Sequence, residues 1–571
     1  LQSAPKKQAD WMVQADEHLV IVGTPAEPAT VAATWVGGAD GNSILSADNW
    51  QGGVTPDLAT FATVATFPDG ATVVIPEGTT ACLKGVETLG ALTVSGAGTL
   101  WTGSAGLTAS GTGALSFGCT VNVSANQTWS VGGHALTFAV ESHIQAPRGV
   151  TWTISHSGSV VNVYSTNEQL FGVSFSSSNN SINLYADNAL GGRFSKVTMS
   201  KSVLAPQGGC TLDADFQWEN VTFDKSVLYV YGGNCETVFN GFVDLYSQND
   251  TRITAEKTTH AIRFKGGFNN IRGSNANNYV RMSPNVRNVH FDAPATISEM
   301  IMLGANSVWF NVAGNKNTRG FYMQHKAVVH TMVPDAFVEG EGATQTPGFI
   351  FVDPGTWNLH GCDQYVEVLC GATNATGEAV VTSDGDALVK LHARTMHYES
   401  EKNSLSDFAC EHFGQTVDGV SYQGGAGIEK SGPIDHYMMG TSTSTGRVSV
   451  TEGRLVFTRA ATDENDVITV PGSLAAAVNV LRHAASWQTA SSVSVSGTGT
   501  LVLEHENVFG KKVDVSIDTS KGAKIELPAG TTMRCGTLIV DGQPVTGDYA
   551  GAGVSGGKLF AGPTGLILLF R

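Results

Sequence analysis

The sequence predicts an all-β protein built as a stacked β-solenoid, and three observations lead to this fold class. Short strand openings recur far apart, as GAGTL at 96–100, GTGAL at 111–115 and GTGTL at 497–501, and such recurrence is typical of repeat architectures. Charged residues make up only 15% of the chain while glycine numbers 67, so few segments could carry the charged face of a surface helix. Residues 427–457 alternate polar strands with glycine-marked corners and end in an apolar run. Each rung of a solenoid contacts only its neighbours, so we expect one long body rather than several globular domains.

The segment 427–457 carries the most specific pattern of the chain. It follows the line Gly-Ile/Leu-x-Lys-x-Gly, then Thr-Gly, then Val-x-x-Gly-x-Leu-x-Phe. The matching residues are Gly427, Lys430, Gly432, Thr445, Gly446, Val450, Gly453, Leu455 and Phe457. This line resembles the autotransporter-associated β-strand repeat of secreted bacterial passenger proteins. The resemblance implies a right-handed parallel β-helix in a protein that is secreted, extracellular or on the bacterial cell surface.

Both ends of the chain extend the resemblance. Residues 34–57, with the Asn-Trp pair at 49–50, resemble the opening of such proteins, and residues 538–549 resemble the segment that precedes their final strand. No run of amphipathic membrane strands follows before Arg571, so we expect a passenger-like body without a translocator barrel. The chain opens without Met and has no apolar run of ~20 residues, so we expect a processed protein without a transmembrane segment.

Composition divides the chain into four regions. We interpret residues 1–30 as an N-terminal arm or cap and residues 31–145 as N-terminal β-helix repeats. Residues 146–425 read as a central, less regular β-helix with insertions, and residues 426–571 as C-terminal repeats with a closing cap. Within the last region, the apolar spacing of residues 470–487 predicts a short helix packed on the side of the solenoid.

The strand pattern also predicts a core. In a parallel solenoid one face of every strand is buried, so the large apolar residues at alternating strand positions should point inward and stack between rungs. The predicted core residues are Trp129, Phe138, Phe223, Phe291, Phe310, Leu455, Phe457, Leu501 and Leu503.

The cysteines predict neither a metal centre nor a cofactor. None of the eight forms a Cys-x-x-Cys pair, which disfavours tetrahedral zinc. Cys210 and Cys235 are about one rung apart and could form a disulfide, as could Cys362 and Cys370 across a hairpin. Alternatively all eight are buried thiols. The Asp-Gly-Asp sequence at 384–386 could donate oxygens to a structural calcium ion, although a tight turn explains it equally well.

Charge is distributed unevenly along the chain. The net charge is −17, yet residues 251–330 hold 10 Lys and Arg against 3 acids, whereas residues 331–420 hold 14 acids against 3 bases. In a solenoid sequence order is axial order, so these counts predict a positive band beside a negative band. Such bands attract an oppositely charged polymer or another copy of the protein.

The positive band predicts a surface for an acidic polysaccharide. Arginine forks would bind carboxylate or sulfate groups, and aromatic side chains would stack on sugar rings. The candidate residues are Arg263, Arg272, Arg281, Tyr279, Trp309 and Tyr322. The alternatives are that these cations only solvate the outer strands or that they promote self-association. Nucleic acid is not a predicted partner, because the overall acidity opposes it and no nucleic-acid motif is present.

Two carboxylates give an enzyme hypothesis. Asp213 and Asp215 alternate in sequence and would project from one face of a strand, with Glu236 near the following rung. A pair of carboxylates can serve as acid and base in glycoside hydrolysis. A lyase would instead use Lys265 or His290 as base, with an arginine of the positive band neutralising the uronate.

Motifs of other enzyme classes are absent. The sequence contains no nucleophile elbow, no His-Glu-x-x-His, no phosphate-binding loop and no dinucleotide fingerprint, which argues against those hydrolases, ATPases and dehydrogenases. We therefore predict a structural or adhesive β-helical protein, with a polysaccharide lyase or glycoside hydrolase as the alternative. The apolar segments 19–23 and 566–570 would either cap the solenoid ends or pair with another copy.

Overall fold

The structure is a computed structural model that confirms the predicted all-β fold. It is a parallel β-solenoid of about 16 turns in all, only 2% helical, whose sheets do not close into a barrel. The chain divides into two compact units, residues 1–267 (unit 1) and residues 268–571 (unit 2), and each is described by itself. The residues that the structure describes are 12–15, 18–21, 29–221, 225–247, 251–270, 279–302, 304–323, 326–338, 349–352, 355–371, 379–393, 416–418, 420–438, 440–460 and 484–562.

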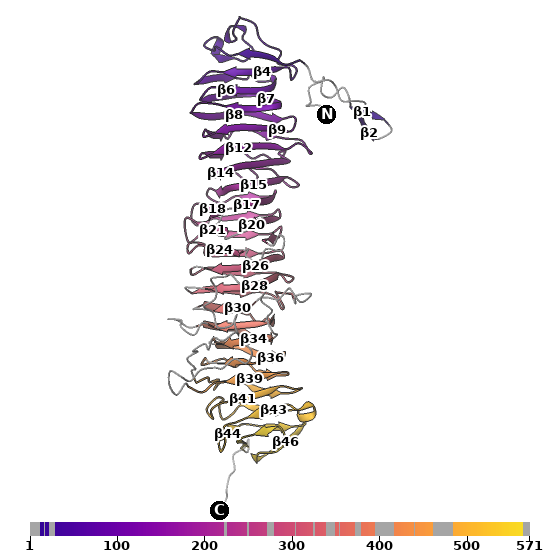
Figure 1. The fold of residues 1–571 in the computed structure, drawn as a ribbon, viewed down its shortest axis with the longest axis vertical. Helices are drawn as coiled ribbons and strands as arrows, with labels where there is room; N and C mark the ends of the chain where they lie inside the picture. Colours follow the sequence, from indigo (N-terminus) through magenta and orange to yellow (C-terminus); the bar gives the residue numbers. More distant parts are fainter. Residues whose placement is uncertain are drawn as a thin grey trace, which may run out of the picture. The chain divides into compact units, whose positions relative to one another are not determined.

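In unit 1 the strands lie in successive layers, each hydrogen-bonded in parallel to the layer before it (Figure 1). Most of them belong to one sheet, namely β3 (Val31–Thr34), β4 (Thr63–Phe67), β5 (Ala71–Val74), β6 (Thr80–Thr88), β7 (Leu92–Ala109), β8 (Ala114–Val123), β9 (Gln127–Gly132), β10 (Ala135–Phe138), β11 (Ile144–Gln145), β12 (Trp152–Ser157), β13 (Val160–Val163), β14 (Gly172–Leu184), β15 (Lys196–Pro206), β17 (Asp215–Val221), β18 (Lys225–Val230), β20 (Val243–Ser247) and β21 (Thr251–Ala255). A second sheet begins with β16 (Thr211–Leu212), β19 (Glu236–Phe239) and β22 (Ala261–Phe264). Two short 3-10 turns, Asp40–Asn42 and Ala47–Asn49, precede β4.

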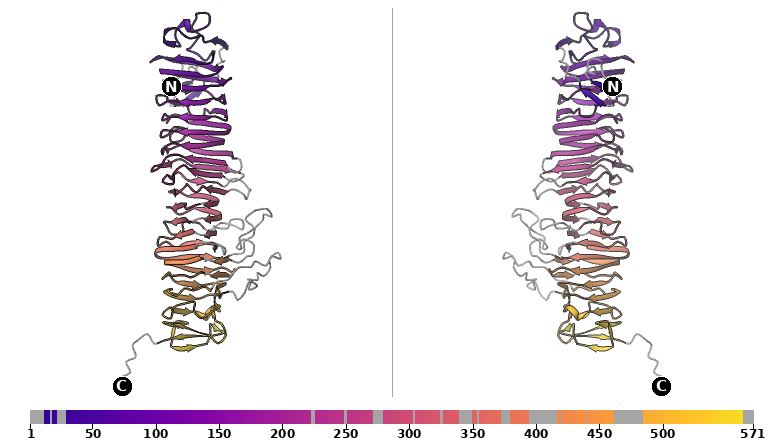
Figure 2. Two further views of the ribbon diagram at one scale, coloured as in Figure 1. Left: turned by 90° about the vertical axis from the view of Figure 1, so that its left-hand side faces the viewer. Right: turned by 90° about the vertical axis from the view of Figure 1, so that its right-hand side faces the viewer.

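Unit 2 repeats this layering, which Figure 2 shows from two further sides. One sheet holds β23 (Phe268–Asn269), β24 (Tyr279–Met282), β26 (Ala295–Met302), β28 (Lys316–Met323), β30 (Phe349–Val352) and β33 (Val368–Gly371). The second holds β25 (Asn288–Phe291), β27 (Ser307–Phe310), β29 (Ala327–Thr331), β31 (Gly355–Asn358), β32 (Gln364–Val366), β34 (Ala379–His392), β36 (Val420–Ser431), β38 (Val448–Val450), β40 (Ser492–Val495), β42 (Asp514–Ile517), β45 (Leu538–Val540) and β46 (Gln543–Val545). The third holds β35 (Thr416–Asp418), β37 (His436–Met438), β39 (Arg454–Phe457), β41 (Thr500–Leu503), β43 (Lys524–Glu526) and β48 (Val554–Ser555). A small separate sheet consists of β44 (Thr532–Cys535), β47 (Gly547–Tyr549) and β49 (Lys558–Ala561). A 3-10 turn spans Thr519–Lys521.

The predicted core is confirmed wherever the structure describes it. Eight of the nine residues are at most 1% exposed, and Phe223 lies outside the described residues. The parallel register places similar side chains next to each other on neighbouring strands, as where Phe117 on β8 opposes Phe138 on β10. Their rings lie 5.6 Å apart. Such columns bury one face of each strand, which is what stabilises a solenoid rung by rung.

The Asn-Trp pair of the opening segment builds a cap on unit 1. The Asn49 side chain accepts from Ala39 N at 2.8 Å and donates to Ala39 O and Ser43 O at 2.8 and 3.0 Å. The Trp50 ring is buried edge-on against Trp35, with centroids 5.1 Å apart, and its Nε1 donates to Ile44 O. One asparagine therefore satisfies the backbone of a whole loop, which explains this part of the opening pattern.

The lysine of the repeat line is an internal corner clamp. Lys430 is 0% exposed, and its Nζ donates to the carbonyls of Ser431, Gly432 and Glu452 at 2.8, 2.7 and 3.0 Å. Burial lowers the pKa of Lys430 to about 8, opposed by the nearby Asp435 and Glu452 carboxylates. The motif lysine is therefore part of the architecture and not of an exposed site.

The closing segment ends the parallel stacking of unit 2. Strands β45 and β46 pair antiparallel around Asp541 and Gly542, whose φ values of 52° and 76° are typical of the two central residues of an Asp-Gly hairpin turn. An antiparallel hairpin turns the chain back along β45 and occupies a sheet edge that would otherwise be open. The apolar segment 566–570 lies outside the described residues.

The predicted helix over 470–487 is wrong at its C-terminal end. Residues 470–483 lie outside the described residues, but Ser486 and Trp487 form parallel bridges with Thr441 and Phe509. Ala485 and Trp487 are both fully buried, the alternation of a strand, so the apolar spacing here has period two and not the helical period. The part of the chain that the structure describes contains no helix long and apolar enough to cross a membrane.

Neither predicted disulfide is present. Cys210, Cys235 and Cys362 are free thiols, and the Sγ of Cys235 lies 3.1 Å from Nδ1 of His260 instead. Burial raises the pKa of Cys210 to about 11. For this residue, the alternative of an inert buried thiol describes the structure better.

The N-terminal arm forms its own sheet. β1 (Met12–Ala15) pairs antiparallel with β2 (His18–Ile21), and no other described strand pairs with either. The apolar strand predicted at 19–23 thus has a partner on one side within the arm itself.

Candidate functional site

The predicted glycan-binding residues fall in both units. In unit 1, Arg263 on β22 donates to the Glu236 carboxylate on β19 at 2.8 Å, so its charge is compensated. Lys265, just after β22, is exposed. In unit 2, Arg281 on β24 is half-buried. Arg272 lies outside the described residues, as do the side chains of Tyr279 and Tyr322, whose backbones lie on β24 and β28.

The predicted carboxylate pair does not lie on a single strand, because a corner separates its members. Asp213 follows β16 and Asp215 begins β17. Asp213 accepts from the Asn188 and Asn240 side chains at 3.1 and 2.7 Å, and Asp215 accepts from Phe242 N at 2.7 Å. Both carboxylates therefore accept hydrogen bonds from corner donors of neighbouring rungs, which gives each of them a structural role.

The structure brings His290 and Trp309 together in a column on the outer side of β25, β27 and β29. The strand register places Trp309 opposite His290 on one side and His330 on the other. The three rings lie parallel, with centroids 4.5 Å apart at 11° and 2°. Because both faces of the indole are covered, Trp309 has no free ring face on which a sugar could stack.

The column continues into a hydrogen-bonded relay that the sequence did not reveal. His330 Nδ1 lies 2.9 Å from His360 Nε2, and His360 Nδ1 lies 3.3 Å from the Asp384 carboxylate. If Asp384 accepts from Nδ1 of His360, then Nε2 of His360 accepts from Nδ1 of His330, which fixes one tautomer for both rings. Burial, together with the nearby His360 and His290, lowers the pKa of His330 to about 4, although the Asp384 carboxylate opposes the shift.

This relay gives a pH prediction. The folded state keeps His330 neutral, whereas an unfolded histidine titrates near 6.5. The stability that depends on neutral His330 is therefore fully present above about pH 6.5 and is lost as the pH falls towards 4. We expect thermal unfolding of a His330→Gln variant to respond less to acid over this range than unfolding of the wild type, measured by circular dichroism. Equal losses in both proteins would contradict the assignment.

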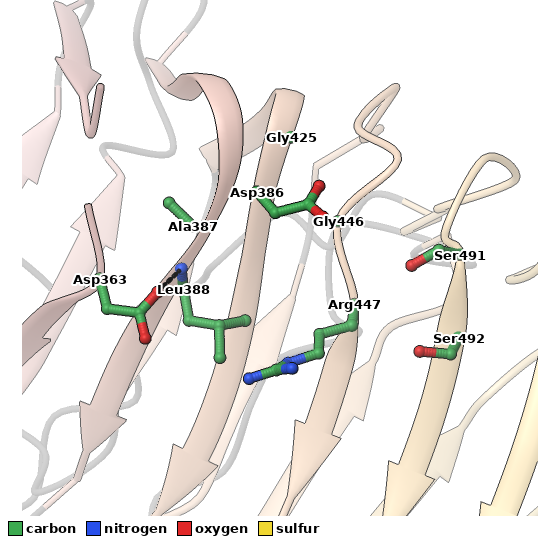
Figure 3. A pocket seen from close by; sticks show the side chains of 9 residues that line it. All are labelled: Asp363, Asp386, Ala387, Leu388, Gly425, Gly446, Arg447, Ser491 and Ser492. Atoms are coloured by element: carbon green, nitrogen blue, oxygen red, sulfur yellow. Dashed lines mark hydrogen bonds between the residues drawn. The ribbon is translucent and has the colours of Figure 1, made fainter. Parts of the chain in front are cut away.

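A polar hollow opens on the same sheet of unit 2, with a volume of about 340 Å³. Its lining comes from successive rungs and comprises Asp363, Asp386, Ala387, Leu388, Gly425, Gly446, Arg447, Ser491 and Ser492. Figure 3 shows the Arg447 side chain extending toward Leu388, with Asp363 beyond it and the two serines on its other side.

Glycines explain why this surface is hollow. Gly427 is the register partner of Leu388, and a Cβ there would meet Leu388 Cδ2 at 2.9 Å and the Arg447 carbonyl oxygen at 2.5 Å. A Cβ on Gly446 would meet the Ala426 carbonyl oxygen at 2.2 Å. The neighbouring rungs leave no space for a Cβ at these two positions. Because no side chain projects there, the surface stays open between the polar groups around it. Both glycines belong to the repeat line, which therefore shapes the hollow without supplying its chemistry.

The charges of the hollow are only partly compensated. Asp363 pairs with Lys390 at 3.3 Å and accepts from Leu388 N at 2.9 Å. Asp386 and Arg447 are exposed, and within the described residues neither makes an ion pair. Asp384 is engaged by His360, and no group of three or more His, Cys, Asp or Glu among the described residues is arranged to hold a metal ion.

Sequence reasoning missed the residues that matter here. It named 384–386 only as a calcium ligand or turn, and it gave no role to Asp363, Arg447, His330 or His360. One signal was available, since Arg447 directly follows Gly446 of the repeat line.

Comparison with known proteins adds no assignment: no protein-family model, no curated protein and no solved structure matches this chain. A function must therefore be argued from the chemistry of the surface.

Proposed function

We propose that this protein is a secreted or cell-surface adhesive β-solenoid that binds an acidic polysaccharide through the hollow around Arg447. The β-solenoid fold is compatible with adhesive and glycan-related roles. The resemblance of residues 427–457 to repeats of secreted passenger proteins supports a location outside the cell. Arg263, Arg281 and Trp309, the residues expected from sequence, are poorer candidates, because they are paired, half-buried or covered on both ring faces.

The observation that carries the proposal is the exposed guanidinium of Arg447, which makes no ion pair among the described residues, beside polar groups that a sugar can use. An arginine fork binds a carboxylate or sulfate group through two parallel hydrogen bonds. The hydroxyls of Ser491 and Ser492 can donate or accept, and Asp386 can accept from a sugar hydroxyl. The hollow thus offers a cation for the acidic group and neutral or acceptor groups for the rest of the ring.

Replacing Arg447 tests the site. We expect Arg447→Ala to weaken binding to immobilised polyuronates and sulfated glycans by about tenfold or more, as expected for loss of a charge-assisted contact. Wild-type binding should also fall with added salt. Arg534→Ala is the matched control, because Arg534 is an exposed arginine that lies over the Phe560 ring. If both variants bind like the wild type on a glycan array, the hollow is not the binding site.

Hydrolysis is the second candidate function, and one observation favours it. Asp363 and Asp386 line the same hollow in different surroundings, since Asp363 pairs with Lys390 and Asp386 makes no ion pair with any residue that the structure describes. Two carboxylates in unlike environments are what acid and base catalysis on a glycoside requires. The polysaccharide used for the binding assay separates the two functions. Release of reducing ends that disappears in Asp386→Asn would favour the enzyme, and unchanged polymer would favour adhesion.

We also propose that copies of the protein associate through the N-terminal arm. The hairpin of β1 and β2 leaves each strand with one open edge among the described strands, and an open edge can pair with another chain. We expect deletion of residues 1–24 to shift the protein from large assemblies to monomers in light scattering. A full-length protein that stays monomeric at high concentration would refute this proposal.

A further inference from the structure

Unit 1 carries a second surface whose chemistry differs from that of the hollow. On each of four strands that pair one after another, β9, β12, β14 and β15, two outward positions on either side of one inward residue hold serine or threonine. The inward residue between each pair, Trp129, Ile154, Phe175 or Met199, is at most 1% exposed. We call the following eight residues the hydroxyl face: Thr128, Ser130, Thr153, Ser155, Ser174, Ser176, Thr198 and Ser200.

The strand register arranges these residues in two straight columns. One column pairs Thr128 with Thr153, Thr153 with Ser174 and Ser174 with Thr198. The other pairs Ser130, Ser155, Ser176 and Ser200 in the same order. Strands in a sheet lie ~4.8 Å apart and alternate residues ~6.6 Å apart, so the hydroxyls form a regular two-dimensional array.

The hydroxyls of this face are unused. None of the eight side chains makes a hydrogen bond within the part of the chain that the structure describes, whereas the polar column nearby is internally bonded, as Asn183 donates to Asn162 at 2.8 Å and accepts from Ser181 at 2.8 Å. The face itself contains no charged side chain, and Lys196 and Lys201 stand only at the border of its last rung. Two shallow hollows lie along it. The one of about 500 Å³ includes residues of both columns, and the one of about 550 Å³ includes the second column, with Lys201 at its edge.

We infer that the hydroxyl face binds an uncharged, extended polysaccharide of the β-1,4-linked type, lying along the stack of rungs. Each free hydroxyl can donate and accept, as can the hydroxyls of a sugar chain. The rung spacing is close to the advance of one pyranose ring in an extended chain, so successive sugars meet equivalent partners. A face without charge suits a neutral polymer, because no ionic group is left unpaired when water is displaced. This site does not depend on the proposed role of Arg447.

Binding to insoluble cellulose and chitin tests the inference, measured as depletion of the full-length protein from solution. We expect Thr153→Glu combined with Ser174→Glu to weaken binding about tenfold or more. The exchange Thr153→Ser with Ser174→Thr should keep it, because the hydroxyls remain. The matched control is Thr72→Glu with Thr93→Glu, two exposed register partners of unit 1 outside the face. Added salt should leave wild-type binding unchanged.

Four results would overturn the inference: no binding of the wild type to either polymer, equal loss in the control variant, a steep fall of binding with salt, or retention on ice crystals without retention on either polysaccharide. Circular dichroism and the thermal unfolding temperature confirm that each variant is folded. Arg447→Ala separates the two sites. Unchanged binding of that variant to cellulose and chitin supports an independent hydroxyl face. If Arg447→Ala loses as much binding to these polymers as the Thr153→Glu and Ser174→Glu variant does, the hydroxyl face is not the site.

Discussion

Replacing Trp129 with alanine is expected to lower the free energy of unfolding of unit 1 by about 3–5 kcal/mol, the cost of truncating a buried aromatic residue. The indole is fully buried between Phe117 and Trp152, with ring centroids 5.1 and 4.9 Å away. Its Nε1 donates to the Gln127 side chain at 2.9 Å. The variant therefore loses packing on two neighbouring rungs and leaves a buried amide oxygen without its donor.

The loss should be local, because each turn of a solenoid contacts only its neighbours. Native-state hydrogen exchange should show faster exchange in β8, β9 and β12, with little change in distant strands. Thr93→Ala is the matched control, since this exposed side chain on β7 should change stability by no more than about 0.5 kcal/mol. Wild-type protection of β9 in the Trp129 variant would contradict the rung-by-rung account of the core.

Replacing Lys430 with alanine is expected to destabilise unit 2 by about 3 kcal/mol or more, because three carbonyls lose their donor at once. They belong to Ser431, Gly432 and Glu452. Gly453 packs against the same ammonium, since a Cβ there would lie 2.9 Å from Nζ.

Two further variants test whether the lost hydrogen bonds of Lys430 cause the destabilisation. Lys430→Met keeps most of the volume but supplies no donor, so it should be nearly as unstable as the alanine variant. Lys524→Ala removes an exposed lysine that pairs with Glu526 at 2.7 Å, a surface pair that contributes at most about 1 kcal/mol. Chemical unfolding that ranks Lys430→Met with the wild type would show that volume, and not hydrogen bonding, holds the corner.

Lys430 also shows why the repeat line of residues 427–457 is informative about the fold and uninformative about function. Lys430 and the glycines at 427, 446 and 453 are required by backbone contacts inside the corners. Residues that face solvent, such as Arg447 within the repeat line and Asp386 on the preceding rung, can vary without cost to the stack. The chemistry of the protein therefore lies at positions that the repeat pattern leaves open.

The sequence by itself determined the all-β solenoid and its inward residues. Period-two alternation fixes which side chains are buried, as for Phe138 and Phe310, and these are local properties that need no knowledge of the neighbouring rung. Where the apolar spacing fitted both a helix and a strand, the prediction from sequence was wrong. The apolar spacing before Trp487 read as a helix, although the residues there alternate as a strand.

The tertiary structure alone decided which outward residues meet. Insertions change the number of residues per turn, as in the 30 residues that separate His330 from its partner His360, so the register between rungs cannot be counted along the chain. A corner placed between Asp213 and Asp215 turned a predicted catalytic pair into two structural acceptors. Stacking of rungs likewise covered Trp309 and left Arg447 and the hydroxyl face open, because the neighbour above and below each side chain is set by register and not by sequence distance.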